Sequence, residues 1–176
     1  MSTSPREIGY LTAMAADRNT LFARLEELGI PTTTIEHAPT FTVEESASLR
    51  KTLPGAHTKS LFLTDSCGRM VLVVAKDDTR VDLKGLAARL QAGRFSFGKA
   101  EVLEAVLGVS AGSVTPFALI NSSAAGIAVV VDRTLMDFAE VNCHPLINTA
   151  TTRLSTRDLI GFIKACGHEP IIVPLA

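Results

Sequence analysis

The spacing of apolar residues predicts a chain in which helices alternate with short strands. Leu21, Leu25 and Leu28 recur at the interval of one helical face, and Gly29 and Pro31 follow as stop signals. Similar patterns predict further helices. Together, the predicted helices cover residues 20–28, 42–51, 83–91, 100–107 and 156–166.

Residues with capping chemistry stand at several of these helix ends. Thr42 and Glu45 have the spacing of a capping box, and Ser155 precedes the last predicted helix. Gly93 and Gly108 follow the two middle helices, in the place where a left-handed residue commonly ends a helix.

Short apolar runs between the helices predict strands. These runs cover residues 32–35, 58–64, 70–75, 94–97, 117–120, 127–131, 138–141 and 171–173. Asp65–Arg69 joins two of them as a hairpin, and several other neighbours are too close in sequence for a parallel crossover. We therefore expect an α/β (α+β) fold, in which a mixed, largely antiparallel sheet closes toward a barrel with surrounding helices.

The chain has the length of one domain. Its 176 residues contain no internal repeat and no linker of low complexity. Residues 1–17 carry no clear apolar period, so we expect residues 1–18 to be an N-terminal extension that need not be ordered. Residues 19–176 are expected to form a single domain.

One polar segment departs from the apolar pattern. Asn142–Thr152 places a histidine, two amides and three threonine hydroxyls beside Pro145. Each of these polar groups needs a hydrogen-bond partner if it is buried. The segment is therefore either a hydrogen-bonded corner or the wall of a polar pocket, and the residues alone leave both interpretations open.

Two other features carry candidate chemistry. Lys59 places an ammonium group at the start of a predicted strand. A lysine in this position can equally be a solvated residue that prevents a sheet edge from pairing with another chain. The loop Ala111–Pro116 contains Gly112, which can adopt backbone angles closed to other residues, and its exit is stiffened by proline. Such a loop can turn N–H groups toward an anion or an oxyanion, although a plain connector has the same composition.

Lys59, the loop Gly112–Pro116 and the run His144–Thr152 occur in an order and spacing that resemble the YbaK/ProRS-associated editing-domain family. The stretch Glu36–Glu45 resembles the branch of free-standing deacylases that clear alanine from mischarged proline tRNA. The resemblance covers residues 20–173. It implies a trans-editing hydrolase that cleaves the ester between a wrong amino acid and the 3′-terminal adenosine of the tRNA.

The resemblance also implies a role for each matching residue. The lysine lies near the 3′ end of the tRNA, the loop holds the aminoacyl end, and the histidine lines the pocket. Catalytic roles are therefore expected for Lys59, Gly112, Ser113 and Val114. Substrate-binding roles are expected for Thr115, Pro116, His144, Asn148 and Thr149. No metal and no other cofactor is implied.

Physical chemistry supports the same reaction. A site that admits proline also admits the smaller alanine, because each lost methylene changes binding by only about 1–3 kcal/mol. A second pocket that is too small for proline removes this error. Hydrolysis then needs a positioned water, which the vicinal ribose hydroxyl of the substrate can orient, and stabilisation of the oxyanion by N–H groups after Gly112. Lys59 is expected to contact phosphate or ribose.

Charge and cysteine content limit the expected binding partners and cellular location. Lys and Arg number 17 against 18 Asp and Glu, so no overall charge attracts the chain to nucleic acid and any RNA contact must be local. Residues that could contact the acceptor stem, or equally form solvated surface, are Arg50, Lys51, Lys76, Arg80 and Lys84. The three widely spaced cysteines, with no signal-peptide pattern and no long apolar run, favour a cytoplasmic protein that does not enter a membrane.

Several alternatives stay open or are disfavoured. The same fold could be a catalytically idle module that binds tRNA or a synthetase, and the pocket could accept cysteine or serine in place of alanine. A Cys143 nucleophile with His144 as its base is disfavoured, because neighbours on a strand point to opposite faces. The sequence shows neither a zinc-ligand spacing nor a DNA-binding helix pattern. The expected partners are the acceptor end of tRNA(Pro) and prolyl-tRNA synthetase, and both a monomer and a homodimer are compatible.

Overall fold

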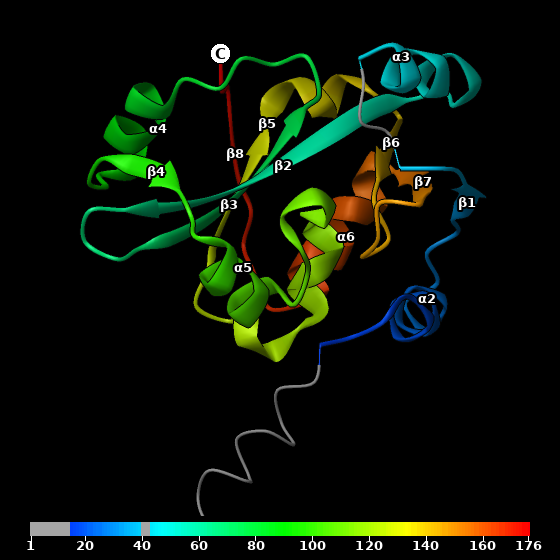
Figure 1. Cartoon of the computed structure of the whole chain (residues 1–176), viewed down its shortest axis with the longest axis horizontal. Helices are drawn as coiled ribbons and strands as arrows, with labels where there is room; N and C mark the ends of the chain where they lie inside the picture. Colours follow the sequence, from blue (N-terminus) through cyan, green and yellow to red (C-terminus); the bar gives the residue numbers. More distant parts are fainter. Residues whose placement is uncertain (1–14, 40–42) are drawn as a thin grey trace, which may run out of the picture.

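The computed structural model describes residues 15–39 and 43–176. Helices and strands alternate along the chain, as the apolar spacing predicts (Figure 1). The α-helices are α2 (Arg18–Glu27), α3 (Val43–Thr52), α4 (Leu83–Leu90), α5 (Ala100–Leu107) and α6 (Thr156–Ala165). The strands are β1 (Thr33–Glu36), β2 (Ala56–Asp65), β3 (Met70–Lys76), β4 (Phe95–Phe97), β5 (Ala128–Asp132), β6 (Glu140–Cys143), β7 (Ala150–Ser155) and β8 (Ile171–Val173). Short 3₁₀ helices are η1 (Ala111–Ser113), η2 (Pro116–Ile120), η3 (Ser122–Ala124) and η4 (Arg133–Asp137).

The strands form one mixed sheet in the order β1-β7-β6-β2-β3-β5-β8, and β4 pairs with β2 outside this path. The antiparallel pairs are β1–β7, β6–β7, β2–β3 and β2–β4. The parallel pairs are β2–β6, β3–β5 and β5–β8. The predicted mixed sheet with surrounding helices is confirmed. In the described part of the chain its edges β1 and β8 do not pair with each other, so the sheet is not a closed barrel.

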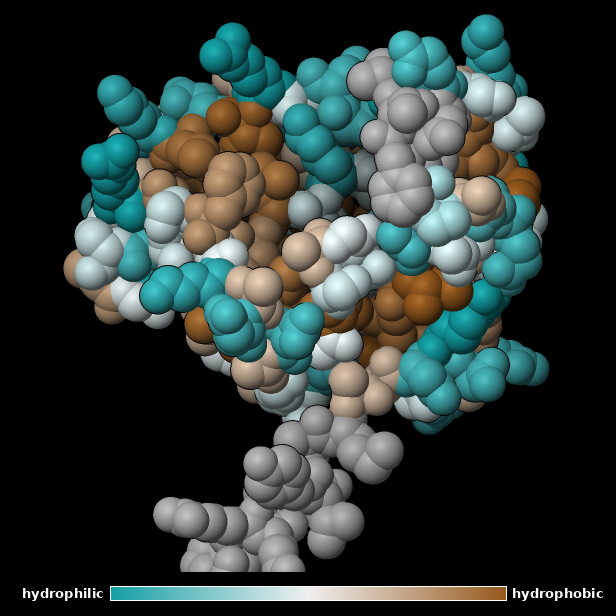
Figure 2. Space-filling view, viewed as in Figure 1, coloured by the Kyte–Doolittle hydropathy of each residue, from teal (hydrophilic) through white to brown (hydrophobic). Residues whose placement is uncertain are grey.

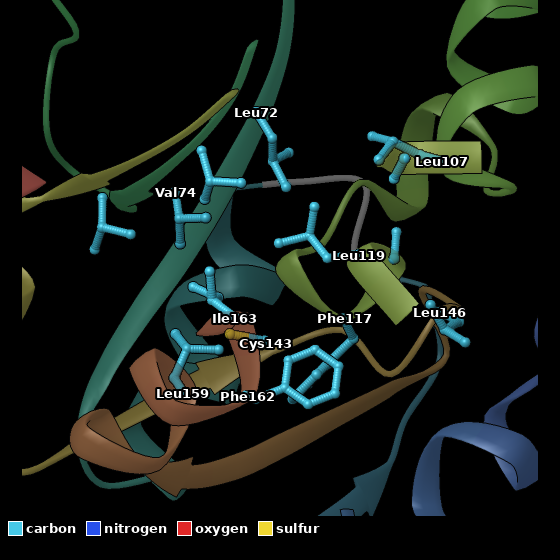
Figure 3. Close-up of a cluster of buried hydrophobic side chains, with 14 of the residues drawn as sticks. Leu72, Val74, Leu107, Phe117, Leu119, Cys143, Leu146, Leu159, Phe162 and Ile163 are labelled. Atoms are coloured by element: carbon cyan, nitrogen blue, oxygen red, sulfur yellow. The ribbon is translucent and has the colours of Figure 1, made fainter. Parts of the chain in front are cut away.

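Two apolar cores cover the two faces of the sheet, because successive side chains on a strand point to opposite sides. Phe62 of β2 belongs to the larger core and Leu63 to the smaller one. In the larger core the rings of Phe117 and Phe162 meet edge to face, with centroids 5.4 Å apart (Figure 3). This core joins η2 and α6 to the sheet and so anchors the loop that precedes η2.

One predicted strand is wrong. Residues 117–120 form the 3₁₀ helix η2 and not a strand. Pro116 occupies the first position of this helix, and the Thr115 hydroxyl oxygen accepts a hydrogen bond from the Phe117 N–H at 3.3 Å. Proline and a capping hydroxyl at these positions start a helical turn. The run resembles a strand in sequence only because nearly all of its residues are buried.

Two other predictions need correction. Ala150–Ser155 forms β7, which was not predicted because its threonines were interpreted as a corner or a pocket, although threonine is well suited to strands. Helix α4 ends at Leu90, and the residue that closes it is Gln91, whose φ is 50°, and not Gly93. The other helix ends match: Gly108 follows α5 with a φ of 68°, and the Ser155 hydroxyl caps α6. Thr42 of the predicted capping box lies outside the described residues.

The end of the predicted extension contacts the domain. The Ala16 N–H donates to the side-chain oxygen of Asn121 at 2.7 Å, and the Asn121 amide in turn donates to the Leu107 carbonyl at 2.9 Å. Residues 15–17 therefore pack beside α5 and η3, whereas the proposed boundary at residue 18 stays a prediction. Among the described helices, none is long and apolar enough to cross a membrane.

Candidate active site

A small polar cavity lies between α3 and the neighbouring ends of β2, β6 and β7. Its volume is about 120 Å³. It is lined by Leu49, Arg50, His57, Thr58, Asp77, Asn142, Cys143, His144 and Thr151. Four of these residues belong to the polar segment Asn142–Thr152. That segment is therefore a pocket wall, and the hydrogen bonds within it also make it a structural corner.

His144 is half-buried at this wall and is held by its own segment. Its Nδ1 lies 3.2 Å from the Ala150 carbonyl oxygen. Because a carbonyl can only accept, Nδ1 carries the proton and Nε2 is left as an acceptor. Burial lowers the pKa of His144 below 6.5, the bond to Ala150 acts in the opposite direction, and a proton on the nearby His37 would lower this pKa further. The imidazole is therefore neutral at pH 7.

The turn that follows His144 contains a strained residue. Leu146 has a φ of 70°, in the left-handed region that a residue with a Cβ rarely adopts. Its side chain is buried in the larger core with Phe117 (Figure 3). Such strain persists only where the surrounding packing enforces it. The apolar core thus sets the path of the chain from His144 to β7.

The glycine-to-proline loop lies directly against this segment. The buried Thr115 hydroxyl donates to the His144 carbonyl oxygen at 2.6 Å. A Cβ placed on Gly112 would lie 3.5 Å from the side-chain nitrogen of Asn148. The structure therefore brings together two predicted site segments that are well separated in sequence.

The backbone of the loop differs from the expectation. Gly112 lies in η1 and does not have a positive φ, so no left-handed conformation explains a glycine here. The Ser113 N–H already donates to the Ser110 carbonyl at 2.9 Å, which disfavours it as an oxyanion donor. Val114 packs against the larger core, and Pro116 is buried. Among the loop N–H groups, those of Gly112 and Val114 remain as proposed donors.

Lys59 lies on the same sheet face as His57 and Asn142, two of the residues that line the cavity. β2 and β6 run parallel with His57 level with Asn142, and Lys59 stands two residues after His57. Because side chains alternate, Lys59, His57 and Asn142 share one face. Lys59 is half-buried and pairs with Ala75 of β3, but it is not among the residues that line the cavity. Its position suits a contact with a part of the ligand that extends out of the cavity.

The remaining predicted site residues flank the cavity without lining it. Asn148 and Thr149 are half-buried, and the Thr149 carbonyl accepts from the His37 N–H at 2.9 Å. Sequence reasoning missed several lining residues, namely Leu49, His57, Thr58, Asp77 and Thr151. Thr151 belongs to the segment already singled out. The others carry no local sequence signal, because the tertiary fold alone brings them to the cavity.

Cys143 is unsuited to nucleophilic chemistry. Burial raises the pKa of its thiol to about 12, although the Thr58 hydroxyl, 3.3 Å from the sulfur, acts in the opposite direction. Only the thiolate is a strong nucleophile. The thiol therefore stays protonated at neutral pH. In the described part of the chain no cluster of three or more His, Cys, Asp or Glu side chains could hold a metal ion.

A larger hollow near α4 does not coincide with the predicted site. Its volume is about 600 Å³, and it is lined by Leu83, Lys84, Ala87, Ala92, Gly93, Arg94 and Phe95. The face seen in Figure 2 shows a hydrophobic area between the positions of α4 and β2. None of the residues expected to act on a substrate lines this hollow. The polar cavity at His144 is therefore the better candidate for the active site.

Comparison with known proteins identifies the family. Residues 37–162 match the family model of the aminoacyl-tRNA editing domain. The chain is 37% identical to the prolyl-tRNA editing protein ProX of Acetoanaerobium sticklandii, over 86% of this chain and 93% of the relative. It is 36% identical to the prolyl-tRNA synthetase associated domain-containing protein 1 of Danio rerio, over 85% of this chain and 82% of the relative.

A solved structure supports the same assignment at the level of the fold. It is described as that of a candidate trans-editing enzyme for prolyl tRNA synthetase, and it superimposes with a TM-score of 0.69 at 19% identity over 99% of this chain and 98% of the other. The matched residues 37–162 include Lys59, the loop before η2 and His144. This chain belongs to the aminoacyl-tRNA editing domain family.

Proposed function

We propose that this chain is a trans-editing deacylase that hydrolyses alanine esterified to proline tRNA. A relative named as a prolyl-tRNA editing protein and the match to the editing-domain family support hydrolysis of an aminoacyl-tRNA ester. The observation that carries the choice of substrate is the cavity of about 120 Å³ at His144. An engineered apolar cavity of about 150 Å³ holds benzene. A cavity of about 120 Å³ therefore has the size of a small aminoacyl group such as alanyl, and the exclusion of proline from it is part of the proposal.

The surrounding groups support a mechanism without a protein nucleophile. Cys143 stays protonated, and an aminoacyl ester is already reactive toward water. The alanyl group enters the cavity beside His144, and the ribose and phosphate of the terminal adenosine lie over Lys59. The vicinal ribose hydroxyl can orient the attacking water, and the Gly112 and Val114 N–H groups are the proposed oxyanion donors.

The proposal is tested with one tRNA that carries different amino acids. Proline tRNA charged with alanine, proline, serine or cysteine is incubated with the purified chain, and the rate of ester hydrolysis is measured. We expect rapid loss of alanine and little loss of proline. Faster hydrolysis of the serine or cysteine ester would reassign the substrate. Hydrolysis of none of the esters, with retained tRNA binding, would indicate a binding module.

A further inference from the structure

Three side chains on the cavity wall already use their hydrogen-bond donors in bonds to other groups of the protein. The Asn142 amide nitrogen donates to the carbonyls of Pro54 at 2.9 Å and Ala56 at 3.2 Å. The protonated Nδ1 of His144 donates to the Ala150 carbonyl. Asn142 and His144 therefore present acceptor atoms only, namely Oδ1 and Nε2.

Thr151 completes this pattern through His37. Nδ1 of His37 lies 2.8 Å from the Ala38 carbonyl oxygen, so in a neutral His37 this nitrogen carries the proton. Nε2 of His37 is then an acceptor, and it lies 2.8 Å from the Thr151 hydroxyl oxygen. The Thr151 hydroxyl consequently donates to His37. Its remaining lone pair is an acceptor on the cavity wall.

The Asn142 oxygen is the clearest sign that a donor is missing. The side chain is only 2% exposed, and its Oδ1 accepts no hydrogen bond from the described residues. The two carbonyls that hold the amide nitrogen prevent a flip of the amide, because a flip would point oxygen at oxygen. A buried acceptor without a donor is unfavourable, so a ligand that donates here is favoured.

The charges around the cavity are balanced before a ligand binds. Arg50 and Asp77 form an ion pair, with 2.7 Å between Nε and Oδ2, although the contact is not aligned as a hydrogen bond. His144 is neutral, so Arg50, Asp77 and His144 together contribute no net charge to the cavity wall. Arg50 is therefore neutralised by Asp77 and does not repel a cationic donor, which the uncharged acceptors on the wall can bind.

From this pattern we propose that Asn142, His144 and Thr151 recognise the α-ammonium group of the aminoacyl ester. An ammonium group has three donors and no acceptor, which complements three acceptors that have no free donor. A methyl, hydroxyl or acylated nitrogen in the same place lacks either the donors or the charge. The pocket therefore selects the amine of its substrate as well as the size of the side chain. This inference rests on the proposed function, because it names a subsite of that substrate.

Binding of two inert analogues tests the amine subsite without requiring catalysis. The first is adenosine with alanine joined to its 3′ position through an amide in place of the ester. The second carries lactic acid in place of alanine, so that a hydroxyl replaces the ammonium at almost equal size. We expect the full chain to bind the alanyl analogue about 10- to 100-fold more tightly, the range of one net hydrogen bond to a charged group.

A matched pair of variants assigns the preference to this wall. Thr151→Val removes the acceptor on the cavity with little change in shape and should reduce the preference for the alanyl analogue several-fold. Thr152→Val removes the neighbouring hydroxyl, which lies outside the cavity and bonds to Thr34 at 2.8 Å, and should leave the preference unchanged. Melting curves confirm that both variants are folded.

Each result decides between the two proposals. Equal affinity of the wild-type chain for both analogues, binding of neither, or a preference that survives Thr151→Val overturns the amine subsite. If the chain prefers the alanyl analogue but does not hydrolyse alanyl-tRNA, the amine subsite stands and the proposed function fails. If the chain hydrolyses alanyl-tRNA but does not distinguish the analogues, the function stands and the subsite is rejected.

Discussion

The Thr115 hydroxyl donates a 2.6 Å hydrogen bond to the main-chain oxygen of His144, and this bond ties the loop before η2 to the cavity wall. Both groups belong to segments that the sequence singled out separately. Thr115 is almost completely buried, so water cannot replace its hydroxyl. The position of the loop relative to His144 therefore depends on this contact.

Thr115→Val should damage both stability and activity. The substitution leaves the His144 carbonyl without its donor, which costs about 1–3 kcal/mol of unfolding free energy. The loop is then no longer held in position relative to the cavity, and kcat/KM for alanyl-tRNA should fall by about 10-fold or more. Urea unfolding and deacylation assays measure the two effects.

Ser123→Ala is the control, because its exposed hydroxyl bonds to the Val106 carbonyl at 2.7 Å where water can substitute. A Thr115 variant as mild as the Ser123 variant would show that the contact is dispensable.

Lys59→Ala should lower deacylation by at least about 10²-fold, the scale of a lost positioning or electrostatic contact. The fold should survive, because the side chain is half-buried and belongs to neither apolar core. Single-turnover hydrolysis and melting temperature are measured together. Lys164→Ala, at an exposed position of α6, is the matched control. Near-normal hydrolysis by a folded Lys59 variant would remove this residue from the site.

His144→Ala should erode the discrimination against proline. The truncation enlarges the cavity. It therefore reduces the cost, about 1–3 kcal/mol, of overfilling the cavity with the proline ring. Hydrolysis of prolyl-tRNA relative to alanyl-tRNA should rise by about 10-fold or more, even if both absolute rates fall. The two esters are compared on the same tRNA. An unchanged ratio would place the size filter on another wall.

Substitutions of Gly112 should act through Asn148 and not through backbone strain. Because Gly112 has no positive φ and a Cβ would meet Asn148 at an ordinary distance of 3.5 Å, Gly112→Ala should change stability by about 0.5 kcal/mol or less. Gly112→Val should displace Asn148 and lower the rate of hydrolysis more than the stability. Melting curves and deacylation rates of both variants distinguish these effects. A collapse of stability in Gly112→Ala would instead show that the backbone requires glycine.

Lowering the pH should reduce the free energy of unfolding, because His144 must then be protonated. The folded pKa of His144 lies below 6.5, so as the pH falls below 6.5 the unfolded chain binds a proton before the folded chain does. Stability present above pH 6.5 is therefore lost progressively as the pH falls through the folded pKa. Protonation also removes the Nε2 acceptor, so activity should fall over the same range. Urea unfolding across this range, compared with His144→Gln, isolates the contribution. Identical pH dependence in the variant would assign it to another group.

Most elements of the fold could be predicted because their signals are local. The apolar period predicted α2, α5 and α6, and the hairpin of β2 and β3 followed from apolar runs around a short turn. The errors arose where burial and hydrogen bonding overrode the local pattern. Residues 117–120 are apolar enough for a strand, but Pro116 and the Thr115 hydroxyl start a 3₁₀ helix there.

The sequence by itself determined the chemical types at the site and the order in which they occur. Lys59, the loop before η2 and the segment from Asn142 were all recognisable from residue type and spacing. Only the tertiary structure decided which of them share a cavity, because that depends on strand pairing and packing between distant segments. The parallel pairing of β2 with β6 brings His57 beside Asn142, and the buried Leu146 directs the chain from His144 to Thr151. Which donors are already bonded, and hence which acceptors remain for a ligand, follows from these long-range contacts and from no local pattern.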